Sequence, residues 1–69
     1  MISAPKLAAR LRARLAELGW TAAELAKRLN QKPPNVSRWL SGRARPGAAN
    51  LVKISRTLGL SLEELLSDS

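Results

Sequence analysis

Cysteine and histidine are both absent from this 69-residue sequence, and its only aromatic residues are two tryptophans. Without cysteine no disulfide can form, and without either residue the usual nucleophile–base pairs and most transition-metal sites are excluded. Apolar runs are far too short to span a membrane. We therefore expect one small cytoplasmic domain over residues 1–69 that is not an enzyme and binds no cofactor.

Acidic residues are scarce and unevenly distributed. Twelve Lys and Arg residues outnumber five Asp and Glu residues, which gives a net charge of +7 and an isoelectric point near 11.6. Residues 1–56 hold all twelve basic residues and only two acidic ones, Glu17 and Glu24. Such a distribution attracts polyanions, although arginines that simply cover solvated helix faces would give the same composition.

Apolar residues recur at helical spacing and β-branched residues are few, which predicts an all-α fold. Capping boxes at Thr21 with Glu24 and at Ser61 with Glu64, together with prolines and glycines, delimit five helices. The expected helices cover residues 5–18, 22–29, 34–41 and 48–58, and the last one begins at residue 61. Their apolar faces predict a single core, formed by Leu7, Leu11, Leu15, Leu18, Leu25, Leu29, Val36, Trp39, Leu51, Ile54, Leu58, Leu62 and Leu65.

A helix-turn-helix is predicted over residues 21–41, where two short helices are joined by residues 30–32. Ala26 is small at the point where the two helices would cross. Asn30 lies four residues later, in a turn that needs a left-handed backbone, which Asn adopts more readily than most residues. Val36 follows at a buried, β-branched position, so several residue types occur at the offsets that this motif requires.

Two adjacent prolines, Pro33 and Pro34, stand where the second helix of the motif begins. Proline fixes φ near the helical value and lacks only an N–H that a first turn leaves unpaired. Since the residue before a proline avoids the α region, we predict that Pro33 is the cap and Pro34 the first helical residue. Both prolines remove amide donors that could bind phosphate, but their rings can still contact a thymine methyl group.

The segment of residues 21–66 resembles the lambda-repressor/Cro-like family, also called the Xre family; it reads TAAELAKRLNQKPPNVSRWLSGRARPGAANLVKISRTLGLSLEELL. Residues 11–21, LRARLAELGWT, resemble the first helix of that family. The resemblance implies a five-helix all-α domain that binds operator DNA, usually as a dimer, with its third helix in the major groove. Family members are mostly transcriptional repressors, toxin–antitoxin regulators and restriction–modification controllers.

The resemblance also implies which residues face double-stranded DNA. The residues expected at bases are Pro33, Pro34, Asn35, Ser37 and Arg38. The residues expected at phosphates are Thr21, Lys32, Ser41, Arg43 and Arg45. The family often carries an acid where Leu40 stands, paired with an arginine of the first helix; its loss leaves Arg10 available as a further phosphate contact.

Each side chain has a chemical reason for its expected role and an ordinary alternative. Arg38 can donate twice to guanine O6 and N7, which is worth about 1–3 kcal/mol of discrimination; alternatively it contacts phosphate or is solvated. Asn35 can pair with adenine N6 and N7, or it can serve as a local helix cap. Ser37 can contact a base or a phosphate. The flexible cations of the turn and loop would add affinity without sequence information.

A homodimer is expected because a single recognition helix reaches only a few base pairs. Two copies on a two-fold axis would place half-sites about 34 Å apart and would match a palindromic operator. The less basic C-terminal tail, with Leu60, Leu62 and Leu66, is the expected dimer surface. The alternative is that these leucines only cover the core.

Two classes of function are consistent with these features. The first is a sequence-specific DNA-binding repressor. The second is a protein-interaction adaptor or antitoxin that uses the same fold, with a toxin or another protein as its partner. The second is favoured by Ala22, which replaces a Gln that contacts phosphate in many relatives, by the acid lost at Leu40, and by the two adjacent prolines. A nonspecific RNA binder would fit the charge, but the stacking aromatics are missing.

Overall fold

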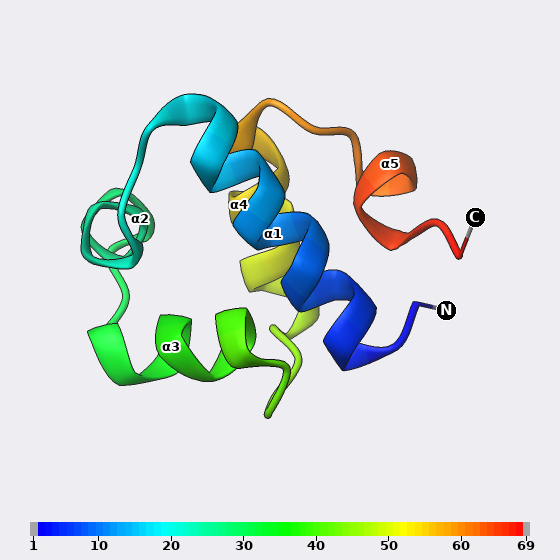
Figure 1. Cartoon of the computed structure of the whole chain (residues 1–69), viewed down its shortest axis with the longest axis horizontal. Helices are drawn as coiled ribbons and strands as arrows, with labels where there is room; N and C mark the ends of the chain where they lie inside the picture. Colours follow the sequence, from blue (N-terminus) through cyan, green and yellow to red (C-terminus); the bar gives the residue numbers. More distant parts are fainter. Residues whose placement is uncertain (1, 69) are drawn as a thin grey trace.

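The computed structural model describes residues 2–68, which form five α-helices and no β-strand (Figure 1). The helices are α1 (Ala4–Leu18), α2 (Ala22–Leu29), α3 (Pro33–Ser41), α4 (Ala48–Leu58) and α5 (Leu62–Leu66). The predicted all-α, five-helix fold is therefore confirmed. The boundaries of α2 and α4 are as predicted, while α1 begins one residue early. None of the helices within residues 2–68 has the length and apolar character needed to cross a membrane.

Both predicted capping boxes form. The hydroxyl oxygens of Thr21 and Ser61 accept hydrogen bonds from the backbone N–H groups of Glu24 and Glu64, at 3.1 and 3.0 Å. Each glutamate in turn accepts from the backbone N–H of its cap residue. These bonds supply partners to amide groups that the first turn leaves unpaired. α2 begins where the sequence predicts, while α5 begins at Leu62, one residue later than predicted, with Ser61 as its cap.

The helices enclose one core, with α1 across the middle of the molecule (Figure 1). α1 packs against α3 and α5, α2 packs against α3 and α4, and α4 packs against α5. Eleven of the predicted core residues are buried: Leu7, Leu11, Leu15, Leu25, Leu29, Val36, Trp39, Leu51, Ile54, Leu58 and Leu65.

One predicted core position is wrong, since Leu62 is 39% exposed. Leu18 is half-buried and packs against the core cluster. Leu62 is the first residue of α5, and this five-residue helix turns Leu65 toward the core. Ile2 is fully buried but was not predicted. It precedes α1, so it lies outside the helical stripe that periodicity detects.

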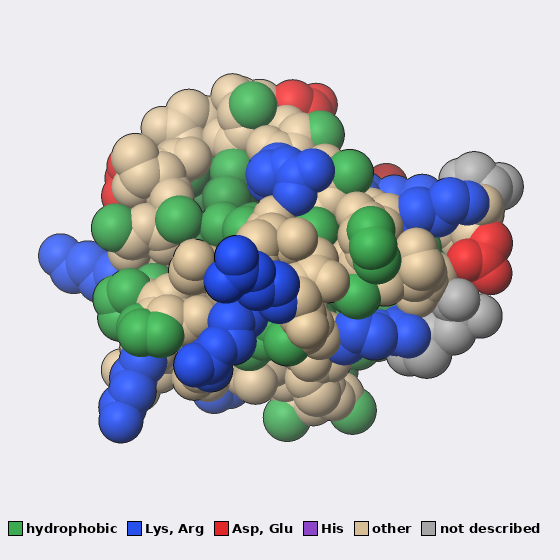
Figure 2. All heavy atoms as spheres, turned by 60° about the horizontal axis from the view of Figure 1, so that its bottom comes forward, with side chains coloured by type: hydrophobic (Ala, Val, Ile, Leu, Met, Phe, Trp, Pro, Cys, Tyr) green, Lys and Arg blue, Asp and Glu red, His purple; other side chains and the backbone are tan. Residues whose placement is uncertain are grey.

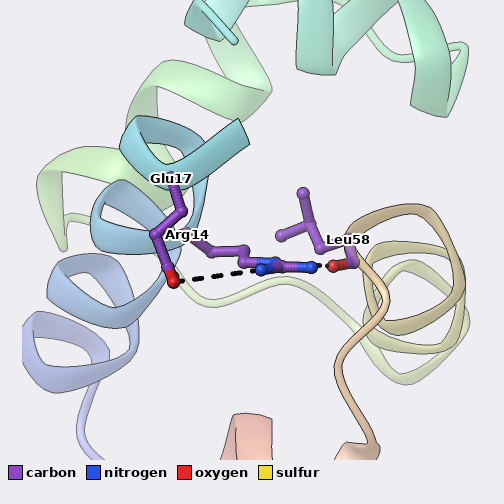
Figure 3. Close-up of polar contacts among 3 residues, drawn as sticks. All are labelled: Arg14, Glu17 and Leu58. Atoms are coloured by element: carbon purple, nitrogen blue, oxygen red, sulfur yellow. Dashed lines mark hydrogen bonds and ion pairs between the residues drawn. The ribbon is translucent and has the colours of Figure 1, made fainter. Parts of the chain in front are cut away.

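Three arginines of α1 bind carbonyl groups at the C-terminal ends of three other helices. Arg12 donates to Leu40 of α3. The Nε of Arg14 donates to the carbonyl of Leu58 in α4 at 2.8 Å, while its Nη1 lies 4.0 Å from the Glu17 carboxylate (Figure 3). Arg10 donates to carbonyls in and just after α5. Terminal carbonyls lack partners within their helix and carry the negative end of its dipole, so these contacts hold α3, α4 and α5 against α1.

The end of α3 lies against the start of α1. Gly42 ends α3 with φ 77°, and a Cβ atom added there would lie 3.1 Å from the Cα of Pro5. Glycine is the residue that adopts this left-handed backbone without steric cost, and it also allows the close approach. Together with the bond from Arg12, this contact sets the position of α3 relative to the rest of the domain.

Candidate nucleic-acid interface

The turn between α2 and α3 has the predicted left-handed residue. Asn30 has φ 54° and ψ 46°, and its N–H donates to Lys27 at 3.2 Å. The next N–H, of Gln31, donates back to the carbonyl of Ala26 at 2.9 Å. Ala26 is 2% exposed and lies inside the core cluster. The small side chain and the left-handed turn together let α3 cross close to α2, as the motif requires.

The start of α3 differs by one residue from the prediction. Lys32, with φ −71° and ψ 136°, is the extended cap, and Pro33 is already the first helical residue. The Lys32 carbonyl accepts from the N–H groups of Asn35 and Val36, at 3.0 and 3.5 Å. The prediction that Pro33 is the cap is therefore wrong. The rule that a residue before proline is extended holds at Lys32, but not at Pro33, which is helical although Pro34 follows it.

This arrangement determines what the N-terminal end of α3 can offer to a ligand. Pro33 and Pro34 occupy the first two helical positions and have no N–H, and the N–H of Asn35 is used by Lys32. Helix N-termini commonly bind phosphate through such amides. At α3 the contacts to a ligand must therefore come from side chains.

The predicted base-facing residues lie together on α3. Val36 and Trp39 point into the core, and the remaining face is turned to solvent. The exposed residues of that face are Pro33, Pro34, Ser37 and Arg38, and Asn35 is half-buried at its edge.

Asn35 belongs to a chain of hydrogen bonds that links three elements. The Nε2 of Gln31, in the turn, donates to Oδ1 of Asn50 in α4 at 3.0 Å. The Nδ2 of Asn35 donates to Oε1 of Gln31 at 3.4 Å, and a guanidinium nitrogen of Arg38 donates to Oδ1 of Asn35 at 3.4 Å. The sequence reasoning assigned no role to Gln31 or Asn50. One signal was available in the sequence, since Gln31 is polar and directly follows Asn30 in the turn of the motif.

Cationic side chains lie at both ends of α3 along the chain. Lys32 precedes the helix, and Arg43 and Arg45 follow it in the loop to α4; all three are exposed. Figure 2, which brings the α3 side of the molecule forward, shows Lys and Arg side chains across this face and acidic ones only at its margins. Within residues 2–68 no group of acidic side chains is placed to hold a metal ion. The chemistry of this face is that of anion binding.

The two predicted hydroxyl contacts are both engaged within the chain. Ser41 is exposed, and its hydroxyl donates to the carbonyl of Arg38 at 3.1 Å. Thr21 is exposed too, and its hydroxyl lies 3.3 Å from the carboxylate of Glu24 as well as capping α2. A phosphate at Thr21 would have to compete with that carboxylate. Phosphate contacts by both residues stay predictions.

Arg10 lies elsewhere. One of its guanidinium nitrogens donates to the carbonyl oxygens of Glu64, Leu65 and Ser67, at 2.8, 3.3 and 2.7 Å. The expectation that loss of an acid near the end of the third helix leaves Arg10 available is therefore corrected, because carbonyls of the C-terminal segment take the place of that acid. A phosphate contact by Arg10 stays a prediction, and the interface proposed below omits this residue.

The three leucines predicted at a dimer surface differ in exposure. Leu60 and Leu66 are half-buried and pack against the core, so covering the core accounts for much of their apolar surface. Leu62 is exposed and is therefore the one whose side chain offers most of its surface to another molecule.

Comparison with known proteins agrees with this geometry. Residues 11–65 match a protein family described as helix-turn-helix. Over 44 residues, 64% of the chain, the sequence is 43% identical to "Multiprotein-bridging factor 1" of Schizosaccharomyces pombe. Over 46 residues, 67% of the chain, it is 46% identical to "Putative multi-protein-binding factor 1" of Yarrowia lipolytica. The matched part spans only 30% of either relative. Since the family match covers most of the chain and the chain folds as five helices that include the helix-turn-helix, the chain belongs to the lambda-repressor-like (Xre) helix-turn-helix family of DNA-binding domains.

Proposed function

We propose that this chain is a sequence-specific transcriptional regulator, a repressor that places α3 in the major groove of operator DNA. One observation carries the proposal: Ser37 and Arg38 share the exposed face of α3, and exposed cations lie before and after that helix. Base-reading groups at the centre and cations at the edges are what a duplex requires of a protein surface.

The roles within α3 follow from donor and acceptor chemistry. Arg38 donates to guanine O6 and N7, and Asn35 pairs with adenine N6 and N7. Pro33 and Pro34 present apolar rings that suit the methyl group of thymine. Ser37 hydrogen-bonds a base edge or an adjacent phosphate.

The phosphate contacts come from residues that surround α3. Lys32, Arg43 and Arg45 act as exposed cations, and Ser41 and Thr21 add hydroxyl contacts. Each neutralised phosphate releases condensed counterions, so the affinity falls steeply with salt. These contacts orient the domain on the duplex, while the α3 side chains select the sequence.

The active species in this proposal is a homodimer on a palindromic site. A two-fold axis would place the two copies of α3 about one helical turn of DNA apart, which is about 34 Å. Leu62, with the neighbouring Leu60 and Leu66, is the proposed contact between protomers. The C-terminal segment that carries them holds three of the five acidic residues, which reduces repulsion between two basic protomers.

The test is selection of duplexes from a random library, followed by binding measurements at about 50 and 200 mM salt. The proposal expects a palindromic sequence and a steep loss of affinity over this range. Recovery of no preferred sequence from a folded chain would contradict it.

A second candidate is a protein-binding module, an adaptor or an antitoxin that uses the same fold. The names of the two relatives, a multiprotein-bridging factor and a multi-protein-binding factor, favour it. The same library separates the candidates. A chain that bridges proteins without reading DNA selects no sequence, and Arg38→Ala then leaves its partner binding unchanged.

A further inference from the structure

We infer that Gln31 is a specificity-determining positioning residue: anchored on Asn50 of α4, it holds Asn35 of α3 in the orientation that reads a base. This inference rests on the proposed function, because it concerns how the α3 side chains are presented to DNA. It assigns a role to two residues, Gln31 and Asn50, that are themselves outside the exposed face of α3.

The bonds form a single path from α4 to the reading face. Asn50 lies in the first turn of α4, Gln31 lies in the turn before α3, and Asn35 lies in the first turn of α3. All three are half-buried, whereas Arg38, at the end of the path, is exposed. The path thus begins on an element that makes no other proposed contact with DNA and ends on the residue proposed to read guanine.

The direction of the path is determined by chemistry at its exposed end. A guanidinium can only donate, so Arg38 requires the carbonyl oxygen of the Asn35 amide. The Asn35 nitrogen must then face Gln31, whose oxygen accepts it and whose nitrogen donates to Asn50. Every amide in the path has one orientation that satisfies its neighbours, and the exchanged orientation would oppose donor to donor.

The orientation of the Asn35 amide matters because it leaves one donor and one acceptor of that amide available to a base. After these bonds, Asn35 retains a second hydrogen on Nδ2 and a second lone pair on Oδ1. Those are the donor and the acceptor that adenine N7 and N6 require.

Ordering the side chain before binding improves discrimination. A side chain that is already held does not lose rotamer freedom when DNA binds, which we expect to be worth about threefold to tenfold in base preference. Loss of Gln31 would leave Asn35 free to rotate its amide, and either edge could then face the base. Preference would fall at the base pair that Asn35 reads and not elsewhere.

The experiment is selection from a random duplex library with the wild type, Gln31→Ala, Gln31→Glu and Asn50→Ala. For Gln31→Ala we expect a loss of preference of about threefold to tenfold at one base pair, with nonspecific affinity within about twofold of wild type. Gln31→Glu keeps an acceptor for Asn35, and Asn50 can rotate its amide to donate. It should retain the preference and weaken binding to all duplexes, because it adds a negative charge. Asn50→Ala should resemble Gln31→Ala with a smaller loss.

Controls separate positioning from simple structural support. Arg43→Ala should weaken binding to all sequences with preference unchanged, and thermal unfolding should show that each variant is folded. If Gln31→Ala lowers affinity uniformly and keeps the wild-type preference, the inference is overturned and the proposed function stands. If the wild type itself selects no sequence, the proposed function fails and the inference fails with it.

Discussion

Two sets of three arginines lie in different parts of this small domain and have different partners. Those of α1, Arg10, Arg12 and Arg14, each donate to a carbonyl at the C-terminal end of another helix. Those around α3, Arg38, Arg43 and Arg45, are exposed, and only Arg38 has a side-chain hydrogen bond among the contacts described above. All six contribute equally to the net charge.

The comparison shows that the contribution of an arginine to the net charge does not determine whether its guanidinium can contact DNA. The long-range field that attracts a polyanion sums over every cation. Short-range contacts with phosphate or base need a guanidinium that can turn toward the ligand, and the α1 set is committed to carbonyls that have no other partner within their helices. We therefore expect substitutions in the first set to change stability and those in the second set to change DNA binding.

The largest effect should come from Arg38→Ala. Loss of a bidentate contact should reduce discrimination at one base pair by about 1–3 kcal/mol, while the free energy of unfolding changes by less than about 0.5 kcal/mol. Library selection and thermal unfolding measure the two quantities. Arg14→Ala is the matched control and should leave base preference intact. If the preference of Arg38→Ala equals that of the wild type, Arg38 does not read a base.

The next effect should come from Arg10→Ala. Its loss leaves the carbonyls of Glu64, Leu65 and Ser67 without the guanidinium nitrogen that now binds them. We expect the free energy of unfolding to fall by about 1–2 kcal/mol, as measured by urea denaturation. Operator affinity of the folded variant should stay within about twofold of wild type, because Arg10 lies outside the proposed interface. A large loss of affinity without loss of stability would show that Arg10 contacts phosphate after all.

A smaller effect should come from Arg43→Ala. Removal of one phosphate contact should reduce the slope of log affinity against log salt by about 1, and weaken binding to all sequences alike. Titrations at several salt concentrations measure the slope. Arg12→Ala, drawn from the α1 set, serves as the comparison and should leave the slope unchanged. Equal slopes for all three proteins would remove the distinction between the two sets.

The smallest effect concerns Glu64, whose backbone carbonyl accepts a hydrogen bond from Arg10. The backbone N–H of Ser61 lowers the pKa of Glu64, the Ser61 side chain adds to this, and Arg14 contributes least. Because the folded pKa is depressed, the contribution of Glu64 to stability is present above its unfolded pKa and is lost as pH falls through the folded value. The melting temperature of the wild type should fall on acidification below pH about 4, and that of Glu64→Gln should fall less. Identical pH profiles would show that the capping carboxylate does not couple to folding.

Local signals predicted much of the fold. The capping boxes at Thr21 and Ser61, and the left-handed residue Asn30, depend on atoms within a few residues of one another, and all three form as predicted. Helical periodicity identified most of the core for the same reason, since one face of a helix is a property of its own sequence. The exception, Leu62, lies at the first position of a helix too short for periodicity to orient.

The candidate interface was predicted less completely. The residue types on α3 and in the following loop pointed to a face of α3, and Pro33, Pro34, Ser37 and Arg38 share the exposed face of that helix. The start of α3 differed by one residue, because the carbonyl of Lys32 rather than that of Pro33 accepts the first helical bonds. The contribution of Asn50 had no local signal, since it lies nineteen residues from Gln31 in sequence.

By itself, the sequence determined the helices, their caps, the turn of the motif and the excess of positive charge, since each depends on neighbouring residues or on composition alone. The tertiary structure decided which arginines bind carbonyls and which face solvent. Arg10 meets its acceptors more than fifty residues along the chain, and Gln31 meets Asn50 only once α4 has packed beside the turn. Such pairs are brought together by packing of the core, and no spacing within a single helix encodes them.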